Sequence, residues 1–129
     1  MHDSSPAAGC VSGRVAIILR LEAALVLALS IFFYREVQAS WILFVVLLLA
    51  PDLGMCGYFA GTRTGAWTYN ALHSYVGPIL LLAAGIYQHA TLPFAIIWGA
   101  HIALDRMLGY GLKYEDSFQH THLGLIGKR

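Results

Sequence analysis

Four long apolar runs joined by short polar links are the feature that most constrains the fold of this 129-residue sequence. The runs cover residues 15–34, 41–60, 66–88 and 92–112. Each has roughly the 20 residues that an α-helix needs to cross the hydrocarbon core of a bilayer. Only 12% of the residues are charged, whereas an ordinary soluble domain has about a quarter. The sequence therefore predicts an all-α integral membrane bundle of four transmembrane helices.

The ends and links of the chain predict its organisation and orientation. Residues 1–13 are small and polar, which is typical of a mobile leader, and they lack the charged start of a secretory signal peptide. A transmembrane domain over residues 14–112 and a polar cytoplasmic tail over residues 113–129 would follow. Four spans place both termini on one side of the membrane. That side carries most of the basic residues, namely Arg14, Arg63, Lys113, Lys128 and Arg129. The opposite links offer only Arg35, so the positive-inside rule predicts that both termini are cytoplasmic.

Composition argues against several other classes of protein. The formal net charge of +1 and the lack of a basic run give no case for a nucleic-acid partner. Cys10 and Cys56 form no CxxC motif, so neither a disulfide framework nor a zinc knuckle is expected. A soluble four-helix bundle would need a polar outer face on every helix, which the second and fourth apolar runs do not supply. The lipid bilayer is therefore the expected partner of most of the chain.

Ionisable residues inside the apolar runs lie at similar predicted depths: Glu22, Asp52, His73, His101 and Asp105. Counted at about 1.5 Å per helical residue, they lie roughly 10–16 Å from the predicted cytoplasmic ends of the spans. His101 and Asp105 are four residues apart, so a helix places the imidazole and the carboxylate on one face. Uncompensated charge at this depth is costly, and intramembrane ionisable groups therefore usually face one another. We expect one polar site to which all four helices contribute.

Two histidines with two or three carboxylates form a ligand set for a divalent metal, zinc or a similar ion. The expected ligands are Asp52, His73, His101 and Asp105. Such a metal lowers the pKa of bound water toward about 7, and Glu22, Asp52 and Asp105 are the candidate catalytic carboxylates. Without metal, the same groups could run acid–base chemistry on a lipid, because burial pushes the pKa values of paired carboxyls apart. The spacing leaves both possibilities open.

Residues of the first two runs also have structural interpretations. Glu22 could form an intramembrane ion pair with Arg20 that only fixes helix packing. Pro51 removes a backbone donor and predicts a kink, after which Asp52 could cap the following half-helix. The glycines of residues 54–61 would allow close helix packing, and the Gly57-to-Gly61 spacing would suit a homo-oligomer.

Residues of the last two runs and the tail have similar alternatives. His73 could be a core histidine bonded to Asn70 or to a backbone carbonyl, and the His101–Asp105 pair could be satisfied without metal. Further candidate members of the site are Arg106, Tyr110 and His122. Arg106 could neutralise a carboxylate or snorkel to lipid headgroups, and Tyr110 could be an interfacial anchor. His122 could fold back as a ligand or remain solvated.

Several multi-residue motifs occur in a fixed order along the chain: RLE, LAPDLGMCGY, YNALHSY, HIALDRMLGYGLKY and THLG. With them the chain resembles a family of small bacterial four-helix membrane proteins that is classed only as a domain of unknown function. The resemblance covers residues 15–126. It implies the four-helix fold and a multi-pass location in the bacterial inner membrane, and it implies no activity.

A second resemblance rests on shorter motifs. Pro51–Asp52, His73–Ser74 and the His101-to-Asp105 spacing follow the order of motifs in inner-membrane proteins classed as metal-dependent hydrolases. Gly54 stands where that group usually has a second acidic residue, and its upstream His-Arg pair is missing here. The resemblance implies a metal-dependent hydrolase of a lipophilic or membrane-interfacial substrate. The alternatives are a metal-free isomerase or cyclase of a lipophilic substrate and a non-enzymatic transport or binding subunit.

Overall fold

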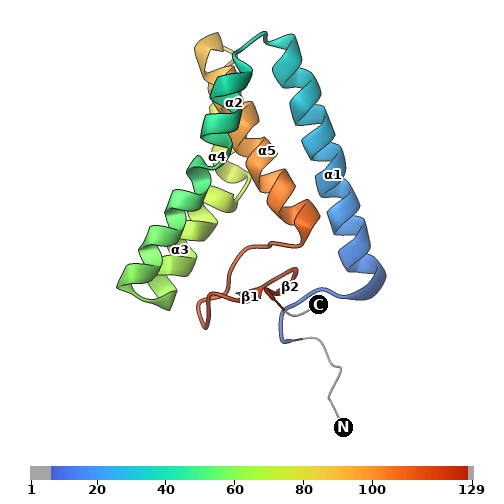
Figure 1. The fold of residues 1–129 in the computed structure, drawn as a ribbon, viewed down its shortest axis with the longest axis vertical. Coiled ribbons are helices and arrows are strands. Elements are labelled where there is room, and N and C mark those ends of the chain that lie inside the picture. The colour runs from blue at the N-terminus through green and yellow to red at the C-terminus, as the bar shows by residue number, and fades with distance from the viewer. Residues whose placement is uncertain (1–6, 128–129) are drawn as a thin grey trace.

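The computed structural model describes residues 7–127 and is built from helices that run up and down the molecule (Figure 1). Each run of the chain up or down the molecule is here called a pass, and the first pass is the single helix α1. The second pass joins α2 to the 3-10 helix η1, and the third joins α3 to α4. A short 3-10 turn, η2, leads into the fourth pass, α5, and a two-stranded hairpin closes the described chain. The bounds are α1 Gly13–Glu36, α2 Trp41–Leu48, η1 Ala50–Ala60, α3 Thr62–His73, α4 Val76–Ala84, η2 His89–Thr91, α5 Leu92–Leu108, β1 His120–Thr121 and β2 Gly124–Leu125.

Helix α5 is the centre of the arrangement. It packs against α1, α2 and α4, while η1 and α3 pack closely on each other as a second unit. In Figure 1, α1 and the η1–α3 pair diverge toward the hairpin end, with α5 between them. The core cluster lies at the opposite end, where Tyr34 and Phe44 meet Ile97 and Ala100 of α5. The Tyr34 hydroxyl donates to the Ser40 carbonyl at 2.6 Å, which satisfies the one polar group of this core.

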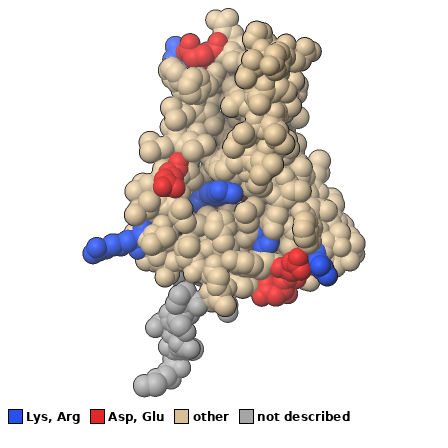
Figure 2. All heavy atoms as spheres, turned by 180° about the vertical axis from the view of Figure 1, so that it is seen from behind, with Lys and Arg blue, Asp and Glu red and all other residues tan. Residues whose placement is uncertain are grey.

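Two segments are long and apolar enough to cross a membrane, by length and composition: Gly13–Glu36 and Trp41–Ala60. Only 6% and 17% of their most apolar windows are buried inside the protein, whereas the core helix of a soluble protein is mostly buried. Large side chains such as Ile42 and Leu53 are at least 70% exposed. Figure 2 shows a broad uncharged stretch between the charged atoms at one end and those nearer the hairpin end. These apolar outer faces are a surface suited to lipid.

The second pass breaks where the sequence predicts a kink, but the change extends further than one turn. Helix α2 ends at Leu48, and all of Ala50–Ala60 is 3-10 helix. A 3-10 run of this length is uncommon. Pro51 cannot donate a backbone hydrogen bond, and the Asp52 N–H bonds to the Leu49 carbonyl at 3.1 Å in the tighter 3-10 pattern.

Glycines bring η1 close to α3, as the sequence predicts for this segment. A Cβ at Gly54 would press on the Thr68 carbonyl, and one at Gly57 would overlap the Thr68 side chain. The Thr68 hydroxyl donates to the Gly54 carbonyl at 2.8 Å across this contact. Gly57 is thus used within the chain, so the homo-oligomer predicted from its spacing to Gly61 has no support at this glycine and stays a prediction.

The third and fourth runs are shorter as helices than the sequence predicts. The third is broken at Ser74, whose backbone is extended, because Pro78 has no N–H to continue the helical hydrogen bonds. Helix α5 ends at Leu108 rather than at residue 112, since Gly109 adopts the left-handed conformation with φ 94° that terminates helices. Both breaks lie next to residues of the predicted polar site.

The tail folds onto the bundle instead of extending away as a polar segment. Lys113 and Thr121 are buried, and the hairpin pairs His120 with Leu125. The leader residues that the structure describes are tied to this tail. Val11 N donates to the His122 carbonyl at 2.9 Å, and the Tyr114 hydroxyl donates to the Gly9 carbonyl at 2.8 Å. The rest of the predicted mobile leader, residues 1–6, lies outside the described residues.

Asn70 is the residue that anchors the start of the tail. Its side-chain amide donates to the Lys113 carbonyl at 2.7 Å, and its side-chain oxygen accepts from the Lys113 N–H at 2.7 Å. We predict that Asn70→Ala undocks the tail, because two backbone groups of a buried residue lose their partners at a cost of about 1–3 kcal/mol. Amide hydrogen exchange over residues 113–127 should accelerate by about tenfold or more. Ala71→Ser, at the exposed neighbouring position, is the control, and equal exchange in both variants would contradict the anchoring role.

Candidate metal centre

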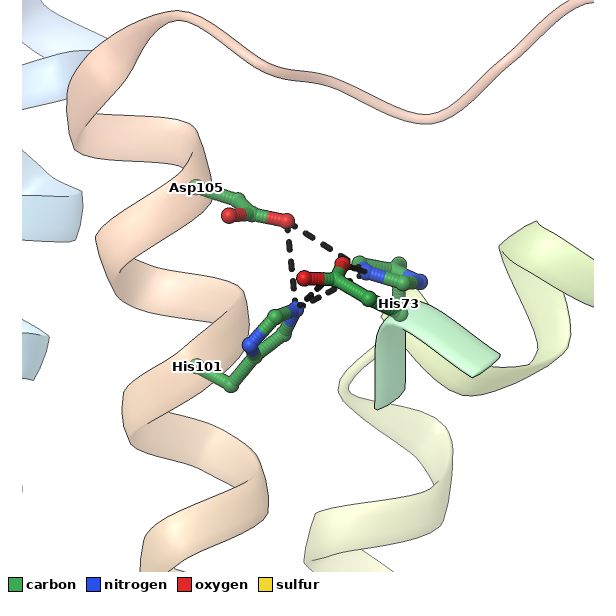
Figure 3. A group of neighbouring side chains, drawn as sticks. His73, His101 and Asp105 are labelled. Carbon is green, nitrogen blue, oxygen red and sulfur yellow. Dashed lines mark hydrogen bonds and ion pairs between the residues drawn. The ribbon is translucent and has the colours of Figure 1, made fainter. Parts of the chain in front are cut away.

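Four side chains from three helical segments converge on one point, and they are the four ligands predicted from the sequence. Asp52 comes from η1, His73 from the last residue of α3, and His101 and Asp105 from α5. One ligand atom from each lies within 4.8 Å of all the others. Figure 3 shows His101 and Asp105 projecting from one face of α5 toward His73 on the neighbouring helix. Such a group could hold a metal ion.

The distances among the four atoms are nearly uniform. His73 Nε2 lies 3.3 Å from Asp52 Oδ1 and 3.3 Å from Asp105 Oδ2. His101 Nε2 lies at the same 3.3 Å from each of these carboxylate oxygens. The two Nε2 atoms are 2.9 Å apart. The four ligand atoms, two imidazole nitrogens and two carboxylate oxygens, therefore form one compact cluster.

Hydrogen bonds to the other ring nitrogen, Nδ1, hold both imidazoles with Nε2 pointing into this cluster. His73 Nδ1 lies 2.8 Å from the Tyr69 carbonyl, and His101 Nδ1 bonds to the Leu48 carbonyl. A carbonyl oxygen only accepts, so each Nδ1 carries the proton and donates it. In the neutral imidazoles the Nε2 atoms then present lone pairs. Hydrogen bonding of the second ring nitrogen to a carbonyl is also the usual way in which proteins orient metal-binding histidines.

The break at Pro51 supplies one of these orienting carbonyls. In a continuous α-helix the Leu48 carbonyl would accept from the N–H of Asp52, four residues on. Here the Asp52 N–H bonds to Leu49 instead, which leaves the Leu48 carbonyl for His101. The same break places the Asp52 side chain beside both histidines. The break at Pro51 thus positions the ligand Asp52 and also frees the Leu48 carbonyl, which orients a second ligand, His101.

The nitrogen-to-oxygen distances suit a tetrahedral divalent ion, and the chemistry of the donor set also favours one. Ligand bonds of about 2.0–2.1 Å in a tetrahedral zinc site place neighbouring ligand atoms about 3.3–3.4 Å apart. All four nitrogen-to-oxygen distances are 3.3 Å, and the 2.9 Å nitrogen pair would need to open by a few tenths of an ångström. Imidazole and carboxylate are ligands that zinc accepts. Five of the six distances among the ligand atoms are therefore close to those that such an ion needs, and the sixth, between the two carboxylate oxygens, is at most 4.8 Å.

Burial differs sharply among the four side chains. His73 and His101 are 4% and 2% exposed, Asp105 is 18% exposed, and Asp52 is 35% exposed. Four acceptor groups with little access to water repel one another unless a cation lies between them. A metal ion would meet this need, and protonation of the histidines, each then donating from Nε2 to a carboxylate, would meet it without metal.

Aromatic and cationic groups that sequence reasoning did not single out support His73. The Tyr69 ring stacks on the His73 ring with centroids 3.7 Å apart and planes 7° apart. Lys113 Nζ lies 4.6 Å from the centre of the Tyr69 ring and 3.1 Å from the centre of the Phe118 ring. Burial lowers the pKa of Lys113 to about 8, opposed by the negative charges of Asp105 and Asp52. The four-residue spacing of Tyr69 and His73 was the available sequence signal.

Glu22 does not join the cluster, which corrects the prediction that it shares the site. Its depth matches, but α1 packs on a different side of α5 from η1 and α3, so equal depth does not bring Glu22 to the histidines. Glu22 is exposed and lines a small cavity with Arg106. Arg20 also has a partner other than Glu22, because its Nε donates to the Met107 carbonyl at 2.8 Å near the end of α5. A role for Glu22 as the catalytic base of this site is not retained.

The other candidate members surround the cluster without joining it. Asn70 anchors the tail and is not the partner of His73. Arg106 lies 4.6 Å from the centre of the Tyr75 ring and donates to the His73 carbonyl at 3.5 Å, near the free carbonyl end of α3. Tyr110 is 38% exposed. His122 accepts a hydrogen bond from Leu112 N at 2.9 Å and therefore folds back as a structural residue.

The two tail histidines are predicted to titrate in opposite directions. Burial, and then the nearby Arg106 charge, lowers the pKa of His122 below its usual 6.5, so the folded tail favours the neutral ring. The hydrogen bond to Asp116 raises the pKa of His120 above 6.5, so the fold favours the charged ring. The His122 contribution to stability is present above pH 6.5 and is lost as the pH falls toward its folded pKa. The His120 contribution is full below pH 6.5 and is lost as the pH rises through its folded pKa.

Imidazole NMR titration of the purified protein measures this difference directly. His120 should titrate at higher pH than His122, and Asp116→Asn should bring the His120 midpoint back toward 6.5 while the His122 midpoint stays in place. The protection factors of the tail amides in Asp116→Asn, which are corrected for the intrinsic pH dependence of exchange, should then decrease as the pH falls below 6.5, since only the His122 contribution remains. A His122 midpoint above that of His120 would contradict the burial of His122.

Comparison with protein families places the chain in one of them. The model of a domain of unknown function, DUF4260, matches residues 16–126. Among curated proteins and solved structures no significant match was found. The matched region includes all five α-helices of the described chain, apart from the first residues of α1, and all four converging ligands. The chain therefore belongs to the DUF4260 family, whose description names no activity.

Proposed function

We propose that this protein is an integral membrane metalloprotein that binds one divalent cation, zinc or a similar ion, and hydrolyses a lipophilic or membrane-interfacial substrate. The observation that carries the proposal is the convergence of Asp52, His73, His101 and Asp105 with four equal nitrogen-to-oxygen distances of 3.3 Å. The orientation of both imidazoles by backbone carbonyls supports it, because this second hydrogen bond fixes the ring for a ligand.

In this proposal all four passes cross the membrane, with both termini in the cytoplasm of a bacterial cell. The exposed apolar surface of α1 and α2–η1 supports crossing by the first two passes. The third and fourth passes also carry large exposed apolar side chains, such as Val76, Ile79 and Leu80 on α4 and Phe94 on α5. The hairpin end bears more basic residues than the opposite end, which favours a cytoplasmic hairpin.

A divalent ion at this site would supply Lewis acidity and lower the pKa of a bound water toward about 7. The residues of the chain have different parts in holding it. His73 and His101 are buried and oriented, so they are the fixed ligands. Asp52 is the most exposed member and lies on the 3-10 segment, so in a catalytic site with three protein ligands it is the carboxylate that would leave the fourth position to water and accept the proton of that water. Asp105 is less exposed and lies on the regular helix α5, and its negative charge would offset part of the positive charge of the ion.

An apolar cavity beside the site supports a lipophilic substrate. It has a volume of about 270 Å³ and is lined by Leu47, Ala50, Pro51, Leu72, Phe94, Ile97 and Trp98. Pro51 and Leu72 directly precede the ligands Asp52 and His73 in the chain. A hydrocarbon chain in this cavity would bring an attached ester or similar group close to the exposed carboxylate of Asp52.

Elemental analysis of protein purified in detergent tests the metal proposal. We predict about one equivalent of zinc or a similar metal per chain, and a fall to near zero in His101→Ala, because loss of one of two imidazoles from four ligands removes a fixed corner of the site. His89→Ala, an exposed histidine outside the cluster, is the matched control and should keep the metal. Wild-type protein that neither contains nor acquires stoichiometric metal would contradict the proposal.

Chelation separates metal-dependent hydrolysis from metal-free acid–base catalysis by the same residues. With a panel of lipophilic esters, we predict activity that disappears with a chelator and returns with added zinc. Asp52→Asn should lower the turnover by about a hundredfold, as expected for loss of a general acid–base group. Ester hydrolysis that survives exhaustive chelation but is lost in Asp52→Asn would instead favour metal-free acid–base catalysis by the same residues.

A second candidate function, passage of a divalent cation across the membrane, is favoured by one observation. Two of the four passes are broken beside the site, at Leu49 and at Ser74, and discontinuous helices of this kind surround ion sites in transporters. The test is zinc uptake into liposomes that contain the purified protein. Uptake abolished by Asp105→Asn, together with no turnover of any ester, would favour this second function over hydrolysis.

A further inference from the structure

An apolar groove runs along α5 on the side away from the metal ligands. Helices α1 and α4 lie on either side of α5 and form its walls (Figure 1). The groove has a volume of about 450 Å³. Its floor includes Ala95, Ile96 and Gly99 of α5, and its walls include Leu29 of α1 and Ile79 of α4. None of the four ligands of the candidate metal site lines it.

The groove continues at its hairpin end into a small polar cavity. This cavity has a volume of about 130 Å³ and shares Val26 and Tyr75 with the apolar groove. Its polar lining is formed by Glu22 of α1, Arg106 of α5 and His122 of the tail. The two cavities therefore form one amphipathic site with a long apolar part and a short charged part.

The charged groups of the polar cavity lack ion-pair partners within the described chain. Glu22 and Arg106 line the same small space, yet they form no ion pair within 4.0 Å among residues 7–127. Arg106 has only the Tyr75 ring and a long bond to the His73 carbonyl. The buried Tyr75 hydroxyl has no hydrogen-bond partner in the described residues. A buried hydroxyl without a partner, beside two unpaired charged side chains at the hairpin end of an apolar groove, suits a ligand with its own charges.

We infer that this site binds one acyl chain of a phospholipid with a zwitterionic headgroup that ends in a primary amine. The phosphate is held by the Arg106 guanidinium and the Tyr75 hydroxyl, and the ammonium group by the Glu22 carboxylate. An anionic lipid would match Arg106 but place its net charge against Glu22. A neutral lipid would leave both charged side chains unpaired. One cation and one carboxylate in a single cavity thus complement a zwitterion, and a primary ammonium group, unlike a quaternary one, has N–H donors for the Glu22 carboxylate.

The length and direction of the site fit a lipid of one leaflet. Leu92 at one end of the groove and Arg106 at the other are 14 residues apart on α5 by their numbers, which is about 21 Å along a helix. Half of a hydrocarbon core is about 15 Å thick. A chain in the groove therefore runs from the hairpin end past the depth of the membrane midplane, with its headgroup near the hairpin. This inference is independent of the metal chemistry.

The glycine at the groove floor offers a way to fill the site. A Cβ added at Gly99 would meet only Pro78 Cβ, at an ordinary contact distance of 3.9 Å, so a larger side chain would extend into the groove. Gly99→Leu is therefore the first blocking variant. Ile79→Trp fills the groove from α4, where Ile79 is 61% exposed, and it covers the case in which Gly99→Leu fails to fold.

Native mass spectrometry of the detergent-purified protein with added single-chain lipids tests the inference. The probes are lysophosphatidylethanolamine, lysophosphatidylglycerol and lysophosphatidylcholine, all with the same palmitoyl chain. We expect the ethanolamine lipid to bind at least tenfold more tightly than the other two. Glu22→Gln should remove this preference, and Arg106→Gln should weaken all three lipids, because each has a phosphate. Arg63→Gln and Glu36→Gln, at exposed positions outside the site, are the controls.

The blocking variants distinguish the groove from general detergent-like binding. Gly99→Leu and Ile79→Trp should each lower lysophosphatidylethanolamine binding at least tenfold while the metal content stays equal to that of the wild type. Extraction of lipid from protein purified without added lipid shows whether the occupant is a membrane phospholipid or an added single-chain amphiphile only. Equal affinity for the three probes, or binding unchanged in both blocking variants, would overturn the inference.

Discussion

Convergence of four acceptor atoms on one point is the interaction on which the rest of the structure depends. His73 and His101 bring their Nε2 atoms to 2.9 Å of each other, with a carboxylate oxygen 3.3 Å from each on two sides. Lone pairs and negative charges at such distances repel, and the buried histidines have little water to reduce the cost. A cation between them reverses the sign of the interaction. The three helical segments that carry the ligands, η1, α3 and α5, would then be tied together at one centre.

The breaks in the helices are what make this convergence possible. Pro51 turns the second pass into 3-10 helix, which places Asp52 at the site and frees the Leu48 carbonyl to orient His101. Pro78 ends α3 at His73, and the exposed carbonyls there bond to Trp98 and Arg106 of α5. Regular helices would have used these backbone groups internally. The helix breaks therefore help to hold the ligands in place. They lie next to apolar segments whose surface is suited to lipid.

Much of the ligand set could be predicted because it depends on local rules. Helical spacing placed His101 and Asp105 on one face, and Pro51 marked the kink beside Asp52. The cost of charge in lipid predicted that these residues would face one another, and the structure brings them together. The same depth argument was wrong for Glu22, because depth along a helix does not say which side of α5 the helix packs against.

The tail could not be predicted from composition because its fold depends on long-range hydrogen bonds. Asn70 bonds to Lys113 across 43 residues, and His120 bonds to the Ala8 carbonyl across 112. Its polar residues suggested solvation, yet Lys113 is 4% exposed among aromatic rings. Aromatic stacking on His73 was likewise visible only in three dimensions, although Tyr69 has helical spacing to it. A single sequence gives no signal of which residues far apart in the chain will form such hydrogen bonds.

X-ray absorption at the metal edge of the purified protein tests the central claim most directly, because it reports the ligands of the ion as well as its presence. The account predicts a zinc-like ion with four nitrogen or oxygen neighbours at about 2.0–2.1 Å and the outer-shell scattering of two imidazoles. His101→Ala should remove that signal. A metal bound through sulfur, or no metal above the level of the buffer, would contradict the site formed by Asp52, His73, His101 and Asp105.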